Sequence, residues 1–191
     1  MDSIDCHRYC YLKTRKRLPN KPDRNSQIKL VLFDMDGVLV DSISSWRHVH
    51  TYFSTNNDHA VDAYVRGKIS DEEFIRHDVN QWKRNNEFIL KKELQTIFSS
   101  VSLMKGAKQC IQQLKPFDVK SGIVSAGIDV LAKKVGEILG IPLVYANELQ
   151  TDDFGRLTGE GLVKVPLMQK DLVVKRISHQ LHIDQEEIAA I

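Results

Sequence analysis

The chain has 191 residues, of which 42% are hydrophobic and 27% are charged, a composition that is ordinary for a globular protein. No apolar run approaches the ~20 residues that a membrane-spanning helix needs, and the first residues lack the apolar core of a signal peptide. From these features we expect neither a membrane protein nor a secreted protein, and no membrane partner. The three cysteines form no even disulfide framework, so we predict reduced thiols in a cytoplasmic protein.

The net charge of +2 hides an uneven distribution of charge along the chain. Residues 1–26 carry seven lysines and arginines against three aspartates, whereas the remaining 165 residues carry 20 basic and 22 acidic side chains. A basic arm of this kind can bind nucleic acid. Because the body of the chain has no matching basic surplus, we instead predict a disordered leader, or a start site assigned too far upstream, and no nucleic-acid partner.

From Gln27 onward, strand-like and helix-like segments alternate along the chain. Short apolar runs bounded by turn residues predict the strands, and apolar residues at helical spacing predict the helices. This alternation favours an α/β fold with a doubly wound parallel sheet. The predicted strands are residues 28–34, 119–125, 143–146 and 187–191, the predicted helices start near residues 44, 70, 87, 106, 127 and 167, and residues 152–159 predict the turn of a small hairpin.

The helical stretch between the first two predicted strands is too long for a single crossover connection. We therefore predict a small helical cap at residues 43–103, inserted into a core that residues 27–42 and 104–191 form. Within the cap, the run SDEE at residues 70–73 is a capping box that predicts the start of a helix. The polar residues 54–60 predict a loop.

Two carboxylates, Asp34 and Asp36, follow the first predicted strand and are themselves followed by Gly37. Side chains at positions i and i+2 of an extended chain point to the same face, so the two negative charges lie close together and repel. Such a pair calls for a cation beside it. The pair is therefore a candidate Mg²⁺ and phosphoryl-transfer site.

Two further segments supply groups that suit a phosphate. The second predicted strand ends in the run VSAG at residues 124–127, where a hydroxyl and free backbone N–H groups at a helix N-terminus would bind an anion. The carboxyl ends of parallel strands lie at one edge of a sheet, so this segment would meet the two acids there. Lys170, near the start of the last predicted helix, is placed to reach the same edge.

The run DMDGVLVDS at residues 34–42, the VSAG segment and Lys170 occur in the order of three motifs of the haloacid dehalogenase-like hydrolases, which the chain resembles over residues 27–191. The stretch ANELQTDDFGRLTGEG at residues 146–161 resembles the hairpin of the phosphoserine phosphatase-like branch of that family. The resemblance implies a Rossmann-like core with a cap. It also implies a Mg²⁺-dependent phosphomonoesterase that acts on a small phosphorylated metabolite.

The resemblance further implies a role for each acid of the first motif. Asp34 would attack phosphorus and form an aspartyl-phosphate. Asp36 would protonate the leaving oxygen and then deprotonate the hydrolytic water. Mg²⁺ would bind the carboxylate of Asp34 and the backbone carbonyl of Asp36. The alternative for both acids is a structural turn after a strand.

The phosphate-binding groups are implied in the same way. The hydroxyl of Ser125 and the N–H groups near Ala126 and Gly127 would hold phosphoryl oxygens. Lys170 would balance the negative charge of nucleophile and phosphate. The alternatives are a plain helix cap for Ser125 and a solvated surface lysine for Lys170.

The chain departs from the family pattern at two places. The fourth motif, which adds a further acid to the metal site, is expected just past Ile191, so we predict a chain truncated before it. The branch also places a glutamate shortly after the first motif, whereas residues 42–46 contain no acid. Arg76 is a cap residue that would grip a substrate carboxylate, with a surface ion pair beside Asp78 as the alternative. Because the fourth motif is missing, a second function stays open, that of a catalytically impaired fragment that acts as a binding module.

Overall fold

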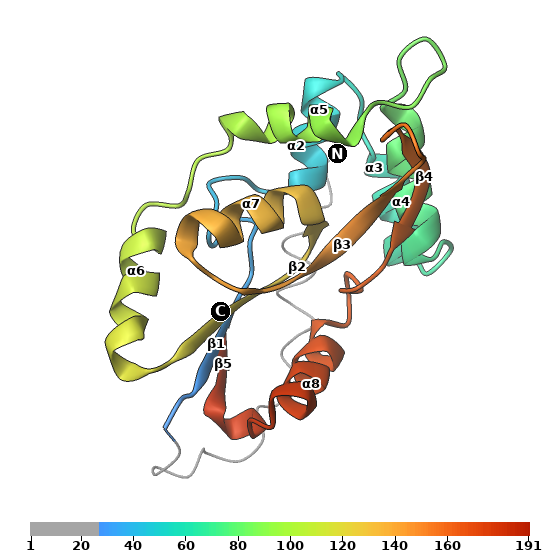
Figure 1. Cartoon of the computed structure of the whole chain (residues 1–191). Coiled ribbons are helices and arrows are strands. Elements are labelled where there is room, and N and C mark those ends of the chain that lie inside the picture. Colours follow the sequence, from blue (N-terminus) through green and yellow to red (C-terminus); the bar gives the residue numbers. More distant parts are fainter. Residues whose placement is uncertain (1–26) are drawn as a thin grey trace, which may run out of the picture.

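The computed structural model describes residues 27–191, which form an α/β fold around a five-stranded sheet (Figure 1). The basic leader at residues 1–26, with Cys6 and Cys10, lies outside the described residues, so the predictions for it stay predictions. Cys110 is a free, exposed thiol. No helix within residues 27–191 is long and apolar enough to cross a membrane.

The sheet has the strand order β4-β3-β2-β1-β5. Strands β1, β2, β3 and β5 run parallel, as the alternation of strands and helices predicts. Strand β4 runs antiparallel to β3 and forms the second arm of the expected hairpin, which makes the sheet mixed. The bounds are Leu30–Phe33 for β1, Lys120–Ile128 for β2, Leu143–Thr151 for β3, Leu157–Leu162 for β4 and Ile188–Ala190 for β5.

Four helices and a short 3₁₀ turn lie within residues 43–103, where the sequence predicts the helical cap. They are α2 (Ser45–Tyr52), α3 (Asp58–Val65), α4 (Asp71–Gln81), α5 (Lys91–Ile97) and the 3₁₀ turn η1 (Phe98–Ser100). The capping box that begins α4 is confirmed, because Ser70 and Glu73 exchange both of its hydrogen bonds. The predicted loop over residues 54–60 is wrong, since α3 begins at Asp58. Only Ala60 of α3 is buried, so its pattern of apolar residues is too weak to identify the helix.

The remaining helices flank the sheet on its two faces (Figure 1). They are α6 (Ala107–Leu114), α7 (Asp129–Leu139) and α8 (Lys170–Leu181), with the short 3₁₀ turns η2 (Lys115–Phe117) and η3 (Gln185–Glu187). Helix α7 begins two residues later than the sequence predicts, because Gly127 and Ile128 continue the extended chain of β2. The end of β2 is therefore strand rather than helix.

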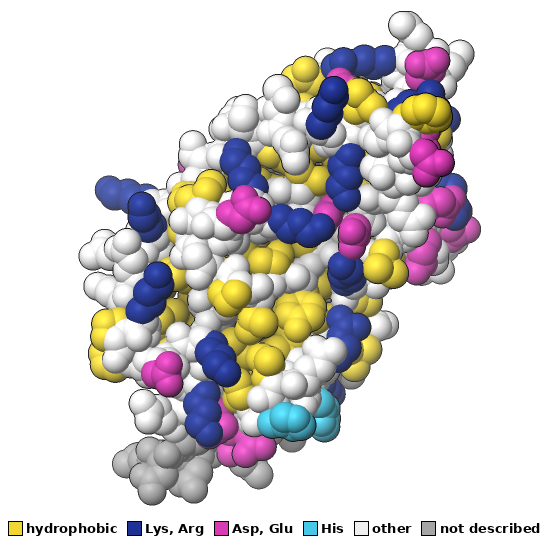
Figure 2. Space-filling view, viewed as in Figure 1, with side chains coloured by type: hydrophobic (Ala, Val, Ile, Leu, Met, Phe, Trp, Pro, Cys, Tyr) yellow, Lys and Arg dark blue, Asp and Glu magenta, His cyan; other side chains and the backbone are white. Residues whose placement is uncertain are grey.

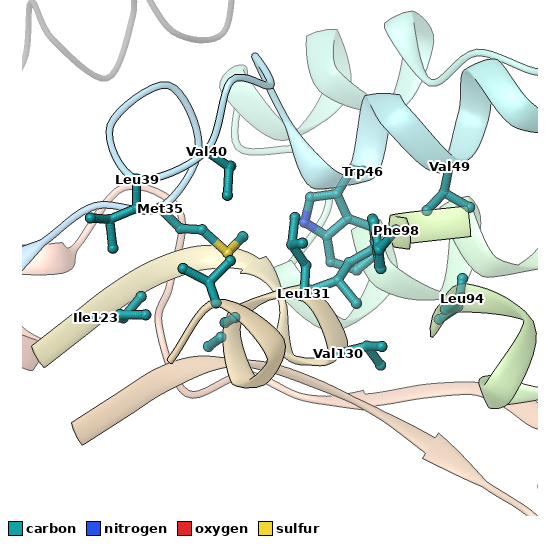
Figure 3. Packing of buried hydrophobic residues seen from close by; sticks show 14 of the residues in the cluster. Met35, Leu39, Val40, Trp46, Val49, Leu94, Phe98, Ile123, Val130 and Leu131 are labelled. Carbon is teal, nitrogen blue, oxygen red and sulfur yellow. The ribbon is translucent and has the colours of Figure 1, made fainter. Parts of the chain in front are cut away.

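Helices α2, α4 and α5 share a single hydrophobic cluster with one face of the sheet. Phe33 of β1, Trp46 of α2, Leu94 of α5 and Leu131 of α7 all belong to it. Figure 3 shows the Trp46 indole pointing from α2 toward Phe98 and Leu131. The start of α2 lies at the carboxyl end of β1 and β2, because Ser45 forms hydrogen bonds with Asp36 and Ile128.

The opposite face of the sheet packs against α8 in a smaller cluster. Leu30 and Leu32 alternate along β1 with residues of the first cluster, and they meet Val173 and Ile177 of α8. Figure 2 shows hydrophobic side chains grouped beside α8 and bordered by lysines and arginines. Helix α8 is thereby fixed on the sheet with its first residue, Lys170, toward the carboxyl edge.

Candidate active site

Strand β1 delivers Asp34 directly after its last buried residue, Phe33. The Oδ2 atom of Asp34 accepts a hydrogen bond from Nζ of Lys170 at 2.5 Å, although the two residues are 136 positions apart in sequence. Its Oδ1 atom accepts the backbone N–H of Met35 at 2.8 Å. The side chains of Asp34 and Lys170 are 28% and 27% exposed, so solvent and a ligand can reach them. Two residues that the sequence singled out are thus brought together.

Asp36 is held by Ser45, the first residue of α2. The Oγ atom of Ser45 donates to Oδ2 of Asp36 at 3.1 Å, and the backbone N–H of Ile128 donates to the same Oγ at 3.1 Å. The Oδ1 atom of Asp36 is buried and has no hydrogen-bond partner among the described residues. Burial raises the pKa of Asp36 from 3.8 to about 6, against the hydrogen bonds from Ser45 and with a contribution from the charge of Asp34. Asp36 can therefore exchange a proton near neutral pH.

The end of β2 approaches the second acid closely. A Cβ atom at Gly127 would lie 2.4 Å from Oγ of Ser45 and 2.9 Å from Oδ2 of Asp36, so only glycine fits at this position. The N–H of Gly127 donates to the Oγ of Ser125 at 3.0 Å, and the next N–H along the chain donates to Ser45. The N–H of Gly127, one of the groups that the sequence predicts for an anion, thus has a partner inside the protein. The hydroxyl proton of Ser125 remains free to be donated, because this oxygen acts here as an acceptor.

The carbonyl of Ala126 is fixed from two sides. It accepts hydrogen bonds from Nε1 of Trp46 and from Nδ2 of Asn147, both at 3.1 Å. Asn147 also donates to the carbonyl of Val165 at 3.1 Å and accepts the N–H groups of Lys164 and Val165 at 3.0 and 2.9 Å. This buried amide therefore ties the end of β2 to the loop that leads into α8.

Sequence reasoning missed both Ser45 and Asn147. Asn147 follows Ala146 at the carboxyl end of a predicted core strand, and a polar residue at that edge of a parallel sheet is a signal that could have identified it. Ser45 belongs to the polar run SISS at residues 42–45 and carries no comparable signal. Only the packing of α2 against the sheet shows where its hydroxyl lies.

Arg76 lies on α4 and forms a bidentate ion pair with Glu160 of β4. Its Nε and Nη2 atoms donate to the two carboxylate oxygens of Glu160, both at 2.9 Å. The side chain of Arg76 is 45% exposed. The alternative partner considered from the sequence, Asp78, is instead fully buried and accepts a hydrogen bond from Asn57 at 2.8 Å. Arg76 therefore joins α4 to β4 of the hairpin in this structure.

The oxygen donors at the carboxyl edge of the sheet suit a hard cation. Asp34 has a partly exposed carboxylate, and Mg²⁺ in proteins is often held by one or two carboxylates together with waters and substrate phosphates. Within residues 27–191 no group of three or more His, Cys, Asp or Glu side chains could hold a metal ion. The donor set thus fits Mg²⁺ when phosphate and water supply the remaining ligands.

Comparison with known proteins places these residues in a family context. The family model of the haloacid dehalogenase-like hydrolases matches residues 31–191. The phosphoserine phosphatase of Archaeoglobus fulgidus is 27% identical over 199 residues, which cover 94% of this chain and 55% of that protein. The phosphoserine phosphatase of Idiomarina loihiensis is 32% identical over 138 residues, which cover 70% of this chain and 59% of that protein. The chain thus spans less than two thirds of the length of these relatives.

Solved structures show the same fold. A phospho-aspartyl intermediate analogue of phosphoserine phosphatase superimposes with a TM-score of 0.69 at 23% identity, covering 86% of this chain and 77% of the other. A probable phosphoserine phosphatase from Vibrio cholerae gives a TM-score of 0.67 at 18% identity, covering 87% and 52%. The expected resemblance to the phosphoserine phosphatase-like branch is confirmed. The chain belongs to the haloacid dehalogenase-like hydrolase family.

Proposed function

We propose that this chain hydrolyses a phosphomonoester through an aspartyl-phosphate formed on Asp34, with Mg²⁺ as its metal ion. The observation that carries the proposal is the 2.5 Å contact between Asp34 and Lys170, with Asp36 two residues away. A lysine beside a carboxylate offsets the repulsion that a carboxylate nucleophile and a phosphate dianion exert on each other. The similarity to phosphoserine phosphatases supports the same chemistry.

The proposed reaction divides between the two acids. An oxygen of Asp34 attacks phosphorus, the bond from phosphorus to the ester oxygen breaks, and Asp36 gives its proton to the departing oxygen. Asp36, now ionised, takes a proton from a water molecule whose oxygen attacks the phosphorus of the aspartyl-phosphate. Inorganic phosphate leaves and Asp34 is a free carboxylate again. The raised pKa of Asp36, about 6, supports these alternating roles.

The neighbouring groups bind phosphate in this proposal. The hydroxyl of Ser125 and the N–H groups near Ala126 and Gly127 hold phosphoryl oxygens, the N–H of Gly127 by giving up its hydrogen bond to Ser125, and Lys170 balances the charge of the phosphate. The carboxylate of Asp34 and the backbone carbonyl of Asp36 would hold Mg²⁺. When bound, the ion neutralises negative charge between nucleophile and phosphate.

The proposed substrate is a small phosphorylated metabolite. Phosphoserine is the natural first candidate, because the relatives are phosphoserine phosphatases. Arg76 is the cap residue proposed to meet a substrate carboxylate, which it could do by leaving Glu160. Residues 42–46 offer no acid for an amine, so the proposal extends to other small phosphomonoesters. The cytoplasmic location likewise remains a proposal from the sequence.

A phosphatase assay with phosphoserine and a chromogenic aryl phosphate tests the proposal. We expect turnover with Mg²⁺, loss of turnover in excess EDTA, and a fall of at least 100-fold in Asp34→Asn. Lys170→Ala should also lose most of its activity, whereas Lys175→Ala, a control on the exposed face of α8, should keep it. Full activity of Asp34→Asn, or no hydrolysis of either substrate, would contradict the proposal.

A second function is favoured by the limited set of metal donors. Because residues 27–191 lack a group of three metal-binding side chains, the ion would be held weakly, and the chain could act as a catalytically impaired binding module. This function predicts that isothermal titration detects binding of a phosphorylated metabolite without turnover. Measurable Mg²⁺-dependent turnover that Asp34→Asn abolishes would rule it out.

A further inference from the structure

Ser45 is a buried hydroxyl between two segments of the candidate active site. It is 0% exposed and starts α2, which contributes none of the residues that the motifs supply. A serine hydroxyl has one proton to donate and lone pairs with which to accept. Because the N–H of Ile128 already donates to Oγ of Ser45, the hydroxyl proton is directed to Oδ2 of Asp36. The hydroxyl thus has a fixed direction.

The carboxylate of Asp36 depends on this residue for its orientation. Its Oδ1 atom has no hydrogen-bond partner among the described residues, and its Oδ2 atom accepts the hydroxyl of Ser45. The backbone N–H of Ser45 also acts on this carboxylate, so removal of the hydroxyl takes away one of its two hydrogen bonds from Ser45 and leaves its orientation less restricted. The end of β2 approaches this contact closely, because a Cβ atom at Gly127 would lie 2.4 Å from the hydroxyl oxygen of Ser45.

Helix α2 itself is anchored, so Ser45 is a rigid support. The neighbouring Trp46 donates from Nε1 to the carbonyl of Ala126 at 3.1 Å. Figure 3 shows the same indole packed among hydrophobic side chains of the core, including Leu131 and Phe98. Ser44 caps the helix by accepting the N–H of Arg47. A shift of α2 would therefore disrupt buried contacts as well as the hydrogen bond to Asp36.

We propose that Ser45 is a positioning residue that holds the carboxylate of Asp36 in the orientation needed to protonate the leaving oxygen. This inference rests on the proposed phosphatase function. Asp36 is the group that would meet the substrate, and Ser45 acts only through it. A small misplacement of a proton donor slows the step that needs the proton far more than it weakens binding.

The test compares leaving groups in the steady state. The ratio kcat/KM reports steps up to the departure of the leaving group, so it excludes hydrolysis of the aspartyl-phosphate. An alkyl phosphate such as phosphoserine needs a proton on its leaving oxygen, whereas p-nitrophenyl phosphate leaves as a stable anion. For Ser45→Ala we expect kcat/KM to fall about 10-fold or more with phosphoserine and less than about threefold with p-nitrophenyl phosphate. The KM for both substrates should change little.

Ser44→Ala is the matched control, because it removes the adjacent hydroxyl from the same helix start without touching Asp36. It should affect both substrates equally. Ser45→Thr, which keeps the hydroxyl, should recover part of the phosphoserine activity, and thermal unfolding of each variant checks that the fold is intact.

An equal loss of kcat/KM with both substrates in a folded Ser45→Ala would overturn the inference while leaving the phosphatase function in place. A wild-type chain without any turnover would overturn both. Selective loss with the alkyl phosphate, together with partial recovery by threonine, would support the role of Ser45.

Discussion

Replacement of Asp36 by asparagine should stabilise the fold at neutral and alkaline pH while it removes activity. Burial favours the neutral form of Asp36, whose pKa rises from 3.8 to about 6. Asp36 therefore contributes stability that is fully present below pH 3.8 and is lost as the pH rises through about 6. The difference between these pKa values corresponds to about 3 kcal/mol, which is the cost of ionising this carboxyl in the folded protein.

Asparagine removes that charge but leaves one amide group without a partner. The buried Oδ1 position has no hydrogen-bond partner, so the amide NH₂ placed there costs on the order of 1–2 kcal/mol. The net gain of Asp36→Asn should be about 1–2 kcal/mol at pH 8. By pH 5 the ionisation cost in the wild type falls to about half, so the gain should largely disappear.

Urea unfolding of the wild type and of Asp36→Asn, in EDTA, measures the gain in the free energy of unfolding at pH 8 and at pH 5. The buried indoles of Trp46 and Trp82 provide the fluorescence signal. Asp34→Asn is the matched control, since it removes the partner of Lys170 and should not stabilise the chain at either pH. If the gain of Asp36→Asn were the same at both pH values, burial of this carboxyl could not be its cause.

Three further substitutions test other parts of the site. Asn147→Ala removes the acceptor of the Lys164 and Val165 N–H groups and a donor to the carbonyls of Val165 and Ala126, of which Ala126 keeps Trp46. The free energy of unfolding in urea should therefore fall by about 2–3 kcal/mol, and a loss below about 0.5 kcal/mol would refute that role. Gly127→Ala forces a Cβ against Ser45 and should cost about 1–3 kcal/mol, and an unchanged free energy of unfolding would refute the close approach. Arg76→Ala should raise the KM for phosphoserine at least threefold if Arg76 leaves Glu160 to bind the substrate carboxylate, and an unchanged KM would limit Arg76 to its ion pair with Glu160.

Much of the fold follows from local patterns in the sequence. The apolar run before Asp34, the alternation of strands and helices and the capping box of α4 all appear where local sequence predicts them. These features depend on neighbours within a few residues, so periodicity and capping chemistry identify them. Helix α3 escapes the same reasoning, because its few buried residues leave a weak pattern.

The motif residues of the candidate site were likewise identified by order and spacing along the chain. The structure adds that Lys170 contacts Asp34, a fact that depends on how α8 packs beside β1. The surroundings of Asp36 follow less directly from the sequence. Ser45 carries no signal of its own, and Asn147 carries only the weak one of its place at a strand end.

The sequence by itself determined the family, the α/β architecture and the two acids after the first strand, because these depend on short motifs and local periodicity. Only the tertiary structure decided which side chains surround those acids. The hydrogen bond from Ser45 to Asp36, the close approach of Gly127 and the pairing of Arg76 with Glu160 all join segments far apart in sequence. Such contacts are set by packing across the sheet edge, and burial there also raises the pKa of Asp36.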